Sequence, residues 1–427
     1  MLIRFSVENF RSFKSCQVLD LTAVKTCKEW IDENTEQTKH GRVLRSAVIY
    51  GANASGKTNL LLAMVRMRSF MLFSTDIDKN QNFLWSEPFL LNTHTYNEPT
   101  TFEVDILLDG VLYNYGFAIK GIAGKYEVVR EWLTEFEKKN EETLFLRQRI
   151  EREDGAVSGS QYYVNAERMP LGKGLDLRTR ADALFFTVAS QFAEPICQQI
   201  AEYVRNSWII ISGVNHDDMG VLTANCLKES SQIAIDIRQL IVNSDIGIQD
   251  VSVSANGRVQ TKHNVRNFEN EIVCQTDFDL LIAESQGTKK IFDLAACIVT
   301  ALREGHILVI DELDAKLHPL LIRRLVLLFN NAITNPNGAQ LIFNAQSADL
   351  LGFKAIPPNK KRQTARLRRD QFYFVEKDNF EASSVYSLIE FRDEAGQGIR
   401  NDDSFAKEYL NGNYGAIPFV GPLVQEK

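Results

Sequence analysis

Hydrophobic and polar residues alternate along much of the first third of the chain, in the manner of β-strands. Residues 1–24 predict strands joined by the loop "NFRSF", and residues 100–137 predict an antiparallel meander. Between them, "SAVIY" at 46–50 predicts a short buried strand, and residues 59–73 predict an apolar-rich helix. This part of the chain therefore predicts a lobe of mixed α and β structure.

The pattern changes near residue 175. Apolar residues recur at every fourth position from Leu184 to Val204, which predicts one face of a helix. Pro195 interrupts that face, so it either kinks the helix or starts a second one. A further helical pattern covers about 226–243, and no heptad repeat is sustained. We expect a helical insertion of modest size rather than a long coiled-coil arm.

Strand patterns return after residue 245. The stretch "DIGIQDVSVSANGRV" predicts strands around a hairpin turn at Asn256-Gly257. The stretches "HILVIDELDAKLHP" and "AQLIFNAQSADLL" predict two buried strands, each followed by a helix. The chain thus predicts an α/β protein that is too long, at 427 residues, for one compact core.

Composition narrows the class of protein. The hydrophobic fraction of 44% and the charged fraction of 24% are ordinary for a soluble globular protein, and no apolar run is long enough to span a bilayer. Six singly spaced cysteines indicate reduced thiols in a cytoplasm, without a disulfide framework or zinc site. The net charge of -7 argues against non-specific coating of nucleic acid. One exception is "KKRQTARLRRD" at 360–370, which is either a solvated loop or a nucleic-acid contact.

The strongest chemical motif follows the strand at 46–50. Residues 51–58, "GANASGKT", match the phosphate-loop pattern G-x-x-x-x-G-K-[ST], with a strand before and a helix after. Backbone N–H groups and the helix N-terminus would hold phosphates, Lys57 would reach the β- and γ-phosphates, and the Thr58 hydroxyl would ligate Mg²⁺. The candidate nucleotide-binding residues here are Gly51, Asn53, Ser55, Gly56, Lys57, Thr58 and Asn59.

A second element lies at the end of the strand at 307–310, where Asp311 and Glu312 follow four apolar residues. Asp311 is placed to hold Mg²⁺, and Glu312 to polarise an attacking water, which suits hydrolysis. The alternative is a solvated acidic turn. Because Thr58 and Asp311 are 253 residues apart, a large insertion must separate the two motifs.

The motifs "NFRSF", "GANASGKT", "ESQGTKK", "VIDELDAKLHP" and "IFNAQSADLL", in this order, resemble ABC-type ATPases of the SMC and RecF kind. The resemblance implies an ABC-type ATPase head with a mixed sheet, an antiparallel meander and a helical insertion. It divides the chain into 1–137, an N-terminal ATPase lobe; 138–245, a mainly helical insertion; 246–392, a C-terminal ATPase lobe; and 393–427, a tail.

The same resemblance implies roles at a site shared between two copies of the chain. Ser285, Gly287 and the following helix N-terminus would cap the γ-phosphate held by the partner's phosphate loop, with Lys289 adding charge. Ser285 as a simple helix N-cap is the alternative. Asp314 would couple the two sites, and the protein would work as a homodimer or higher homo-oligomer that binds ATP and Mg²⁺.

The resemblance implies three further placements. Arg11 and Phe13 would lie near the nucleotide, and His318 would start a helix. Gln81 is one candidate for the glutamine that links the nucleotide to the insertion. Gln346 stands where many relatives have a histidine, and an amide can hydrogen-bond a γ-phosphate or water but cannot act as a base. We therefore expect slow hydrolysis.

The stretches "EPFLLN", "PTTFEVDILLDG", "RRDQFYFVEKD" and "YLNGNYGAIPF" resemble the RloA and AbiL-type ATPases of bacterial phage-defence and abortive-infection operons. This resemblance implies a cytoplasmic sensor or scaffold that controls a separate effector, a nuclease or toxin from the same operon. The 78 residues after Asp349 show no nuclease metal cluster. Alternatives are a RecF-like DNA-repair or chromosome-maintenance ATPase that binds DNA, and a small-molecule kinase, which leaves Glu312 and Ser285 without a role.

Overall fold

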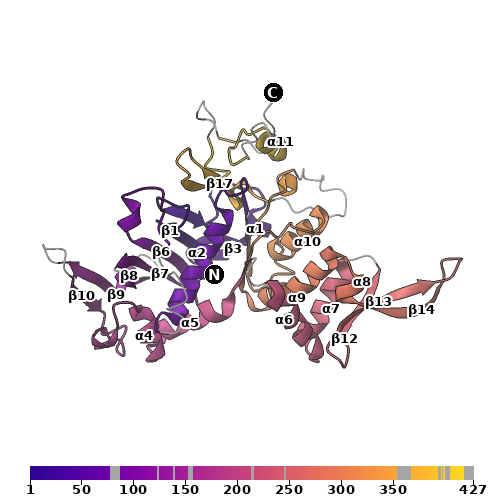
Figure 1. The fold of residues 1–427 in the computed structure, drawn as a ribbon, viewed down its shortest axis with the longest axis horizontal. Coiled ribbons are helices and arrows are strands. Elements are labelled where there is room, and N and C mark those ends of the chain that lie inside the picture. The colour runs from indigo at the N-terminus through magenta and orange to yellow at the C-terminus, as the bar shows by residue number, and fades with distance from the viewer. Residues whose placement is uncertain are drawn as a thin grey trace.

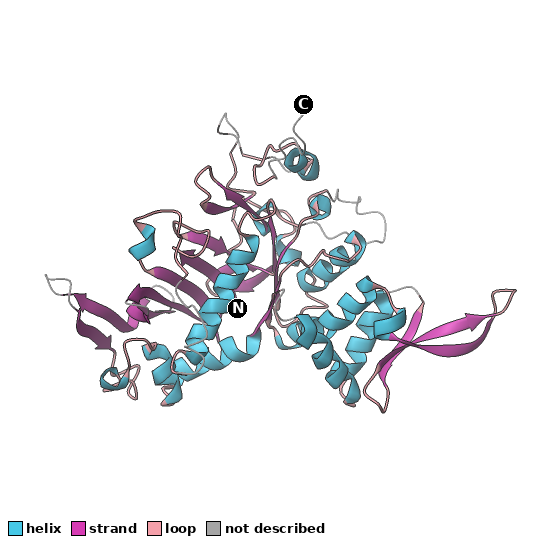
Figure 2. Ribbon diagram, viewed as in Figure 1, coloured by secondary structure: helices cyan, strands magenta, loops and turns pink. Residues whose placement is uncertain are grey.

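The fold consists of two large sheets with helices packed around them (Figures 1 and 2). The computed structural model describes residues 1–76, 87–122, 125–137, 140–151, 157–212, 216–244, 247–352, 367–392, 396, 398–399 and 404–417. The meander lies on one side of the molecule and the helices α6 to α9 on the other, with the parallel sheet between them (Figure 1).

The first sheet has seven antiparallel strands in the order β10-β9-β8-β7-β6-β1-β2. Its inward residues share one core with α2, α4 and α5, because alternate side chains of each strand point to the same face. The bounds are β1 Leu2–Glu8, β2 Gln17–Asp20, β6 Thr100–Leu108, β7 Val111–Ile122, β8 Lys125–Glu137, β9 Asn140–Glu151, β10 Val157–Val164, α2 Lys57–Phe73, α4 Phe185–Gln191 and α5 Pro195–Ser207.

The second sheet has the order β11-β15-β16-β5-β17-β18, and all its strands are parallel except β18. It is covered on both faces, and β5 shows this directly: Ala47 and Ile49 belong to one core, Val48 and Tyr50 to the other. The bounds are β5 Ser46–Tyr50, β11 Trp208–Ile211, β15 Ile307–Ile310, β16 Gln340–Asn344, β17 Phe372–Lys377 and β18 Ser383–Ser387.

The second core is built around α9, which packs against α6 and α7 and lies next to a three-stranded sheet. In that sheet β13 and β14 form an antiparallel pair that projects from the molecule (Figure 1), and β14 is exposed along nearly its whole length. The bounds are α6 His216–Lys228, α7 Gln232–Ser244, β12 Ile248–Val253, β13 Val259–Arg266, β14 Ile272–Asp279, α8 Leu280–Ala283, α9 Gln286–Glu304 and α10 Pro319–Asn330.

Smaller elements complete the described chain. They are α1 Ile31–Asn34, β3 Thr35–Thr38, β4 Gly41–Leu44, α11 Phe405–Leu410 and the 3₁₀ turns η1 Thr95–Asn97, η2 Asp176–Arg178, η3 Ala348–Leu350 and η4 Arg369–Gln371. Across the described ranges, no helix combines the length and the apolar character needed to cross a bilayer.

The expected α/β class with a mixed sheet and an antiparallel meander is confirmed. Pro195 starts a second helix as N1 of α5, because a proline at this position sacrifices no helical hydrogen bond. Gly257 lies in the predicted hairpin turn with φ of 80°. The strands β14, β17 and β18 were not predicted.

One expectation about helices is incomplete and another is wrong. The helical patterns at 184–204 and about 226–243 do form helices, α4, α5 and α7, but β9 and β10 within residues 138–245 extend the meander, and β11 is a strand of the parallel sheet. The strand β16 is followed by the 3₁₀ turn η3 rather than by a helix. The domain boundaries themselves stay a prediction.

Candidate nucleotide-binding site

The phosphate loop connects β5 to α2 at the carboxyl edge of the parallel sheet, where open α/β sheets place their ligands. Gly56 precedes the helix with φ of 114°, and a Cβ there would lie 2.6 Å from Ser383 Oγ and 2.8 Å from Ser12 Oγ. At Gly51 a Cβ would lie 2.3 Å from the Val375 carbonyl oxygen. Both glycines are therefore required by close packing against β17, β18 and the "NFRSF" loop.

Lys57 is buried and folded back over the loop. Its Nζ donates to the carbonyl oxygens of Gly51 at 2.7 Å and Ala52 at 2.9 Å. Burial lowers the pKa of the Lys57 ammonium, while the nearby carboxylates Glu312 and Asp311 oppose that shift. The ammonium thus lies inside the loop, on the same side as the acidic turn.

Ser55 gives a direct test of whether the loop fits a phosphate. Its hydroxyl is buried and lacks a hydrogen-bond partner within the described chain, although buried hydroxyls are normally paired. A Cβ at Gly51 would lie 2.6 Å from this hydroxyl. An unpaired hydroxyl facing the backbone of a phosphate loop fits a phosphate oxygen, and the residues of the loop therefore fit the triphosphate of a nucleotide.

The acidic strand end meets the phosphate loop through a chain of hydrogen bonds. Thr58 Oγ1 donates to Asp311 Oδ1 at 3.3 Å, and Asn344 Nδ2, from the end of β16, donates to the same oxygen. Asn344 Oδ1 accepts from the Glu312 backbone N–H. At the far end, Gln346 Nε2 donates to Glu312 Oε1 at 2.9 Å. The structure therefore brings Thr58, Asp311, Glu312 and Gln346 together.

Asp314 and Lys290 hold the loop that follows Glu312. Asp314 Oδ2 accepts from the backbone N–H groups of Gln346 and Ser347, both at 2.7 Å. Lys290 Nζ, from α9, donates to the carbonyl oxygens of Glu312 at 2.6 Å and Ala315 at 2.9 Å. Burial lowers the pKa of Lys290 to about 8, although Asp314 and Glu312 act in the opposite direction. Glu312 itself adopts a left-handed φ of 52° and is exposed.

The "NFRSF" loop braces the helix that follows the phosphate loop. Asn59 Nδ2 donates to Ser12 Oγ at 2.9 Å, and Arg11 Nη1 lies 3.5 Å from Asn59 Oδ1. Arg11 Nε donates to Glu87 Oε2 at 2.5 Å, and Arg66 holds the other oxygen of Glu87 at 2.8 Å. Arg11 therefore lies beside the phosphate loop.

The structure also gives the positions of three other residues named in the sequence analysis. Phe13 is fully buried in the first core. Asn53, within the phosphate loop, is exposed. His318 is the N-cap of α10, where its Nδ1 accepts from the Leu320 N–H at 3.2 Å. Gln81 lies outside the described residues.

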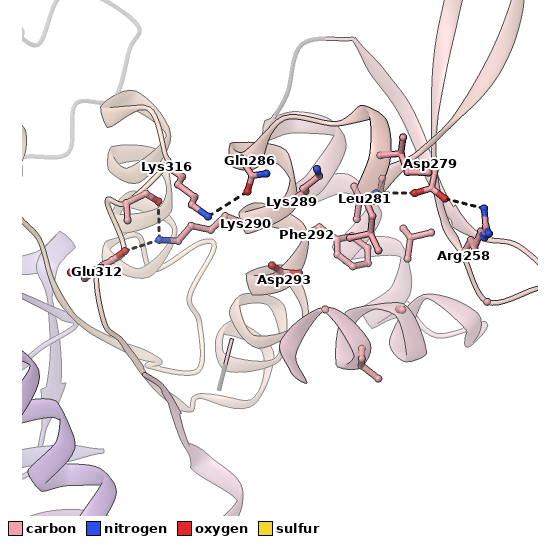
Figure 3. Close-up of a pocket in the computed structure, with 18 residues that line it drawn as sticks. Arg258, Asp279, Leu281, Gln286, Lys289, Lys290, Phe292, Asp293, Glu312 and Lys316 are labelled. Atoms are coloured by element: carbon pink, nitrogen blue, oxygen red, sulfur yellow. Dashed lines mark hydrogen bonds and ion pairs between the residues drawn. The ribbon is translucent and has the colours of Figure 1, made fainter. Parts of the chain in front are cut away.

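Ser285, Gly287 and Lys289 lie at the start of α9 and form a separate part of the site. Ser285 is the N-cap, and its Oγ accepts from the Thr288 N–H at 3.1 Å. Gly287 packs against the loop after Glu312, where a Cβ would lie 3.0 Å from the Lys316 carbonyl oxygen. Lys289 lines a cavity of about 960 Å³ (Figure 3). Within the described chain no hydrogen bond links these residues to the phosphate loop of their own copy.

The basic stretch at 360–370 lies mostly outside the described residues. Its described arginines are both engaged within the chain. Arg368 is buried and pairs with Asp370 at 2.6 Å, and Arg369 pairs with Glu29 at 3.0 Å.

Several residues that position the site were not predicted from the sequence. Asn344 was inside a motif that we recognised, but no rule assigns a function to the residue that ends a strand. Ser383, whose Oγ donates to the Ser55 carbonyl oxygen at 2.5 Å, lies 328 residues from it and gives no local signal. The positioning roles of Lys290 and Glu87 were likewise not predicted, because nothing in the sequence distinguishes them from other charged residues.

The residues also fit Mg²⁺. The Thr58 hydroxyl and the Asp311 carboxylate are oxygen donors, and Mg²⁺ in phosphate sites takes few protein ligands, with phosphate and water supplying the rest. Within the described residues no cluster of three or more His, Cys, Asp or Glu side chains could hold a metal alone. The metal would therefore depend on the nucleotide for its remaining ligands. Thr58 and Asp311 would hold it beside the phosphates.

The fold and this site define a nucleotide-binding ATPase domain with a phosphate loop. The sequence profile of one family, described as "AAA domain, putative AbiEii toxin, Type IV TA system", matches residues 46–161 and 229–351. Because the match covers more than half of the chain, the protein belongs to this AAA domain family. A comparison with curated protein sequences gives no match.

Solved structures with a similar fold include heads of SMC proteins. The SMC head domain from Thermotoga maritima is 13% identical, with a TM-score of 0.41, covering 90% of this chain and 98% of that chain. An SMC head bound to the C-winged helix domain of ScpA is 11% identical, with a TM-score of 0.45, covering 90% and 97%. An SMC head with an extended coiled coil, bound to the ScpA C-terminal domain derived from Pyrococcus furiosus, is 10% identical, with a TM-score of 0.37, covering 90% and 96%.

Proposed function

We propose that this protein binds ATP with Mg²⁺, hydrolyses it slowly, and pairs with a second copy of itself to control a separate effector protein. The observation that carries the proposal is the hydrogen-bonded chain Thr58–Asp311–Asn344–Glu312–Gln346, which connects a phosphate loop to an exposed carboxylate. Bound Mg²⁺ would supply charge neutralisation at the phosphates.

The residues support hydrolysis of ATP by water rather than phosphoryl transfer to another acceptor. Glu312 is exposed beside the loop and can accept a proton from an attacking water, while Asn344 fixes the direction of its backbone. Gln346 occupies one oxygen of Glu312, and its amide cannot take up a proton. This arrangement supports slow turnover, and a turnover of roughly tens per second, ordinary for enzymes, would refute it.

Pairing is supported by the position of Ser285, Gly287 and Lys289. They form an exposed or half-buried helix N-terminus that is tied, through Lys290 and Gly287, to the loop after Glu312. A helix N-terminus with a free approach suits an anion presented from outside. We propose that this anion is the γ-phosphate in the partner's phosphate loop, and that Asp314 links the two sites.

The defence role rests on resemblance and on the family. The motifs resemble RloA and AbiL-type ATPases, and the family description names a toxin–antitoxin system. We propose an ATP-dependent sensor or scaffold of anti-phage defence, acting in the cytoplasm, whose effector is a nuclease or toxin encoded beside it. A DNA-binding RecF-like role is weakened at Arg368 and Arg369, which already pair with carboxylates.

The deciding experiment is the solution mass of Glu312→Gln with and without ATP, purified with its genomic neighbour co-expressed. This variant keeps the phosphate loop and lacks the carboxylate, so it should bind ATP and hydrolyse it poorly. An ATP-dependent change in mass or in retained neighbour is expected. Lys57→Ala is the control that should ignore ATP. A stable mass that ignores ATP, with no neighbour retained, would reject the proposal and make DNA binding at low salt the next test.

A further inference from the structure

The motif "EPFLLN" at 87–92, which the ATPase chemistry leaves unexplained, packs directly on the "NFRSF" loop. The Arg11 N–H donates to the Glu87 carbonyl oxygen at 2.7 Å, and the Phe89 N–H donates to Asn9 Oδ1 at 2.9 Å. These two hydrogen bonds lay the start of one motif along the other. Because Arg11 and Glu87 are 76 residues apart in the chain, only the fold brings them together.

The Glu87 carboxylate bridges two arginines. Its Oε2 accepts from Arg11 Nε at 2.5 Å, and its Oε1 accepts from Arg66 Nη2 at 2.8 Å and Nε at 3.1 Å. The Glu87 and Arg66 side chains are each 18% exposed, and that of Arg11 is 33% exposed. Charge-assisted hydrogen bonds are short and directional, and partial burial reduces their screening by salt. Glu87 thus connects the "NFRSF" loop to α2, the helix that begins in the phosphate loop.

The bond to Nε leaves the terminal nitrogens of Arg11 available to a ligand. A guanidinium has five N–H donors, and Glu87 takes the one on Nε. Arg11 Nη1 lies 3.5 Å from Asn59 Oδ1, and among the residues that the structure describes Nη2 has no hydrogen-bond partner. Asn59 belongs to the first turn of α2. The terminal nitrogens therefore lie beside the helix N-terminus that follows the phosphate loop, where a phosphate is favoured.

The backbone and a neighbouring ring restrict Arg11 further. Arg11 has a left-handed φ of 50°, which is uncommon for a residue other than glycine and persists only where its surroundings impose it. Its Cζ lies 5.8 Å from the centroid of the Phe10 ring, which is fully buried. The ring, the backbone hydrogen bond and the Glu87 carboxylate thus restrain one side chain. An arginine ordered before its ligand arrives loses less conformational entropy on binding.

The charges of the cluster explain why a carboxylate is tolerated here. A carboxylate beside a phosphate-binding arginine would by itself cancel the arginine's charge and weaken anion binding. Because Glu87 is shared with Arg66, the two arginines and the carboxylate keep one net positive charge. Without Glu87, two like charges would face each other in a partly buried place and repel. Glu87 therefore fixes the direction of Arg11 and leaves its attraction for an anion intact.

We infer that Glu87 is a positioning residue for ATP: it orients the Arg11 guanidinium so that the terminal nitrogens donate to phosphates held by the phosphate loop. This role rests on the proposed function, because the ligand is taken to be the triphosphate of ATP. Glu87 acts through Arg11, and Arg66 preserves the positive charge of the cluster. The first residue of "EPFLLN" thereby controls nucleotide affinity.

The first test measures the dissociation constant for ATP by calorimetry in the Glu312→Gln background, which limits hydrolysis. Arg11→Met should weaken binding by about tenfold to a hundredfold, because a charge-assisted hydrogen bond to phosphate is lost. Glu87→Gln should weaken it by about tenfold, because a neutral amide has one acceptor oxygen and cannot hold both arginines. Glu87→Gln also removes a negative charge, so an effect of charge alone would instead tighten ATP binding. The direction of the change separates orientation from charge.

The second test asks whether Glu87 acts through Arg11. In the Arg11→Met background, Glu87→Gln should change ATP affinity by less than about twofold, because two residues that act as one unit are not additive. A loss of the same size in both backgrounds would show that Glu87 acts independently of Arg11, and would overturn the positioning role.

Glu135→Gln is the matched control. Glu135, in β8, accepts from Arg168 Nη2 with both oxygens at 2.6 Å, and its side chain is 5% exposed. Like Glu87→Gln, this variant breaks a partly buried ion pair, so both should lose stability in urea unfolding. Glu135→Gln should keep its ATP affinity, because its ion pair lies in the meander. Equal losses of ATP affinity in the two variants would reduce Glu87 to a structural residue.

A failure of the proposed function looks different from a failure of the positioning role. If the Glu312→Gln protein with Glu87 and Arg11 intact binds no ATP, the proposed function fails, and the positioning role with it. If that protein binds ATP, but Arg11→Met binds equally well or Glu87→Gln binds as tightly or more tightly, only the positioning role is overturned.

Discussion

Asn344 gives the sharpest test of how the site is held together. It is 1% exposed, and its amide makes two hydrogen bonds, one to the Asp311 carboxylate and one from the Glu312 N–H. Asn344→Ala removes the hydrogen-bond partner of both the Asp311 carboxylate and the Glu312 N–H at a largely buried position. Each unpaired group costs about 1 to 3 kcal/mol, so the free energy of unfolding should fall by about 2 to 6 kcal/mol. Hydrolysis should fall as well, because Glu312 loses its backbone anchor.

Urea unfolding measures the stability change, and turnover per folded molecule measures the catalytic one. Asn335→Ala is the matched control: Asn335 is fully buried and makes three hydrogen bonds away from the site, to the Phe329 and Ala339 carbonyl oxygens and from the Ala339 N–H. It should lose comparable stability and keep its turnover. A loss below about 1 kcal/mol for Asn344→Ala, less than one unpaired buried group costs, with unchanged turnover, would show that the amide does not organise the site.

Asn344→Asp separates the two hydrogen bonds. The new carboxylate still accepts from the Glu312 N–H but faces the Asp311 carboxylate, and like charges raise the pKa of a carboxyl pair. The destabilisation is therefore present at neutral pH and is lost as pH falls through the raised pKa, because one proton restores a donor. A deficit that stays constant from pH 7 to about 4, near the ordinary carboxyl pKa, would contradict this account.

Three further outcomes are expected. Gly56→Ala should weaken ATP binding at least about tenfold by calorimetry, because its Cβ would collide with two hydroxyls, whereas Gly257→Ala, which also has a positive φ but open space, should not. The pKa of Lys290 is lowered to about 8 from an ordinary 10.5, so between these pH values the unfolded chain binds more protons than the folded one. The free energy of unfolding should therefore rise with pH from about 8 to 10.5. Lys290→Met should flatten this rise, as measured by urea titrations. Ser285→Ala should cost about 1 kcal/mol as a lost N-cap and, if the site is shared, abolish hydrolysis while single copies still bind ATP.

The phosphate loop and the acidic strand end could be predicted from the sequence because their chemistry is local. Eight consecutive residues identify the phosphate loop, and a buried strand followed by two acidic residues identifies the acidic strand end. Asn344 and Ser383 could not be found in this way, because their roles come from which strands are neighbours. The order β15-β16-β5-β17 decides that, and no local pattern encodes it.

The fold shows the same division. The strand and helix at 46–73 and the hairpin turn within 245–259 were predicted because each element shows its own local pattern. Within 138–245 the helices were predicted, but β9, β10 and β11 were not, because these strands belong to sheets whose other strands lie elsewhere in the chain. Which core an apolar stripe joins is a tertiary property, and α5 and α7 have similar patterns but pack in different cores.

The order of strands in the parallel sheet sets a constraint on synthesis. β5 is made long before its two neighbours, β16 and β17, and Ser46 of β5 also bonds to Asn330 of α10 across 284 residues and to Gln371 of η4 across 325. At about 5 to 20 residues per second, β5 waits for its partners for on the order of tens of seconds. Throughout that time an entirely apolar-packed strand has two unpaired edges, which invite association with other chains. The ATP site, which needs Thr58 and Asp311 together, therefore forms only after β15 and β16 have been synthesised.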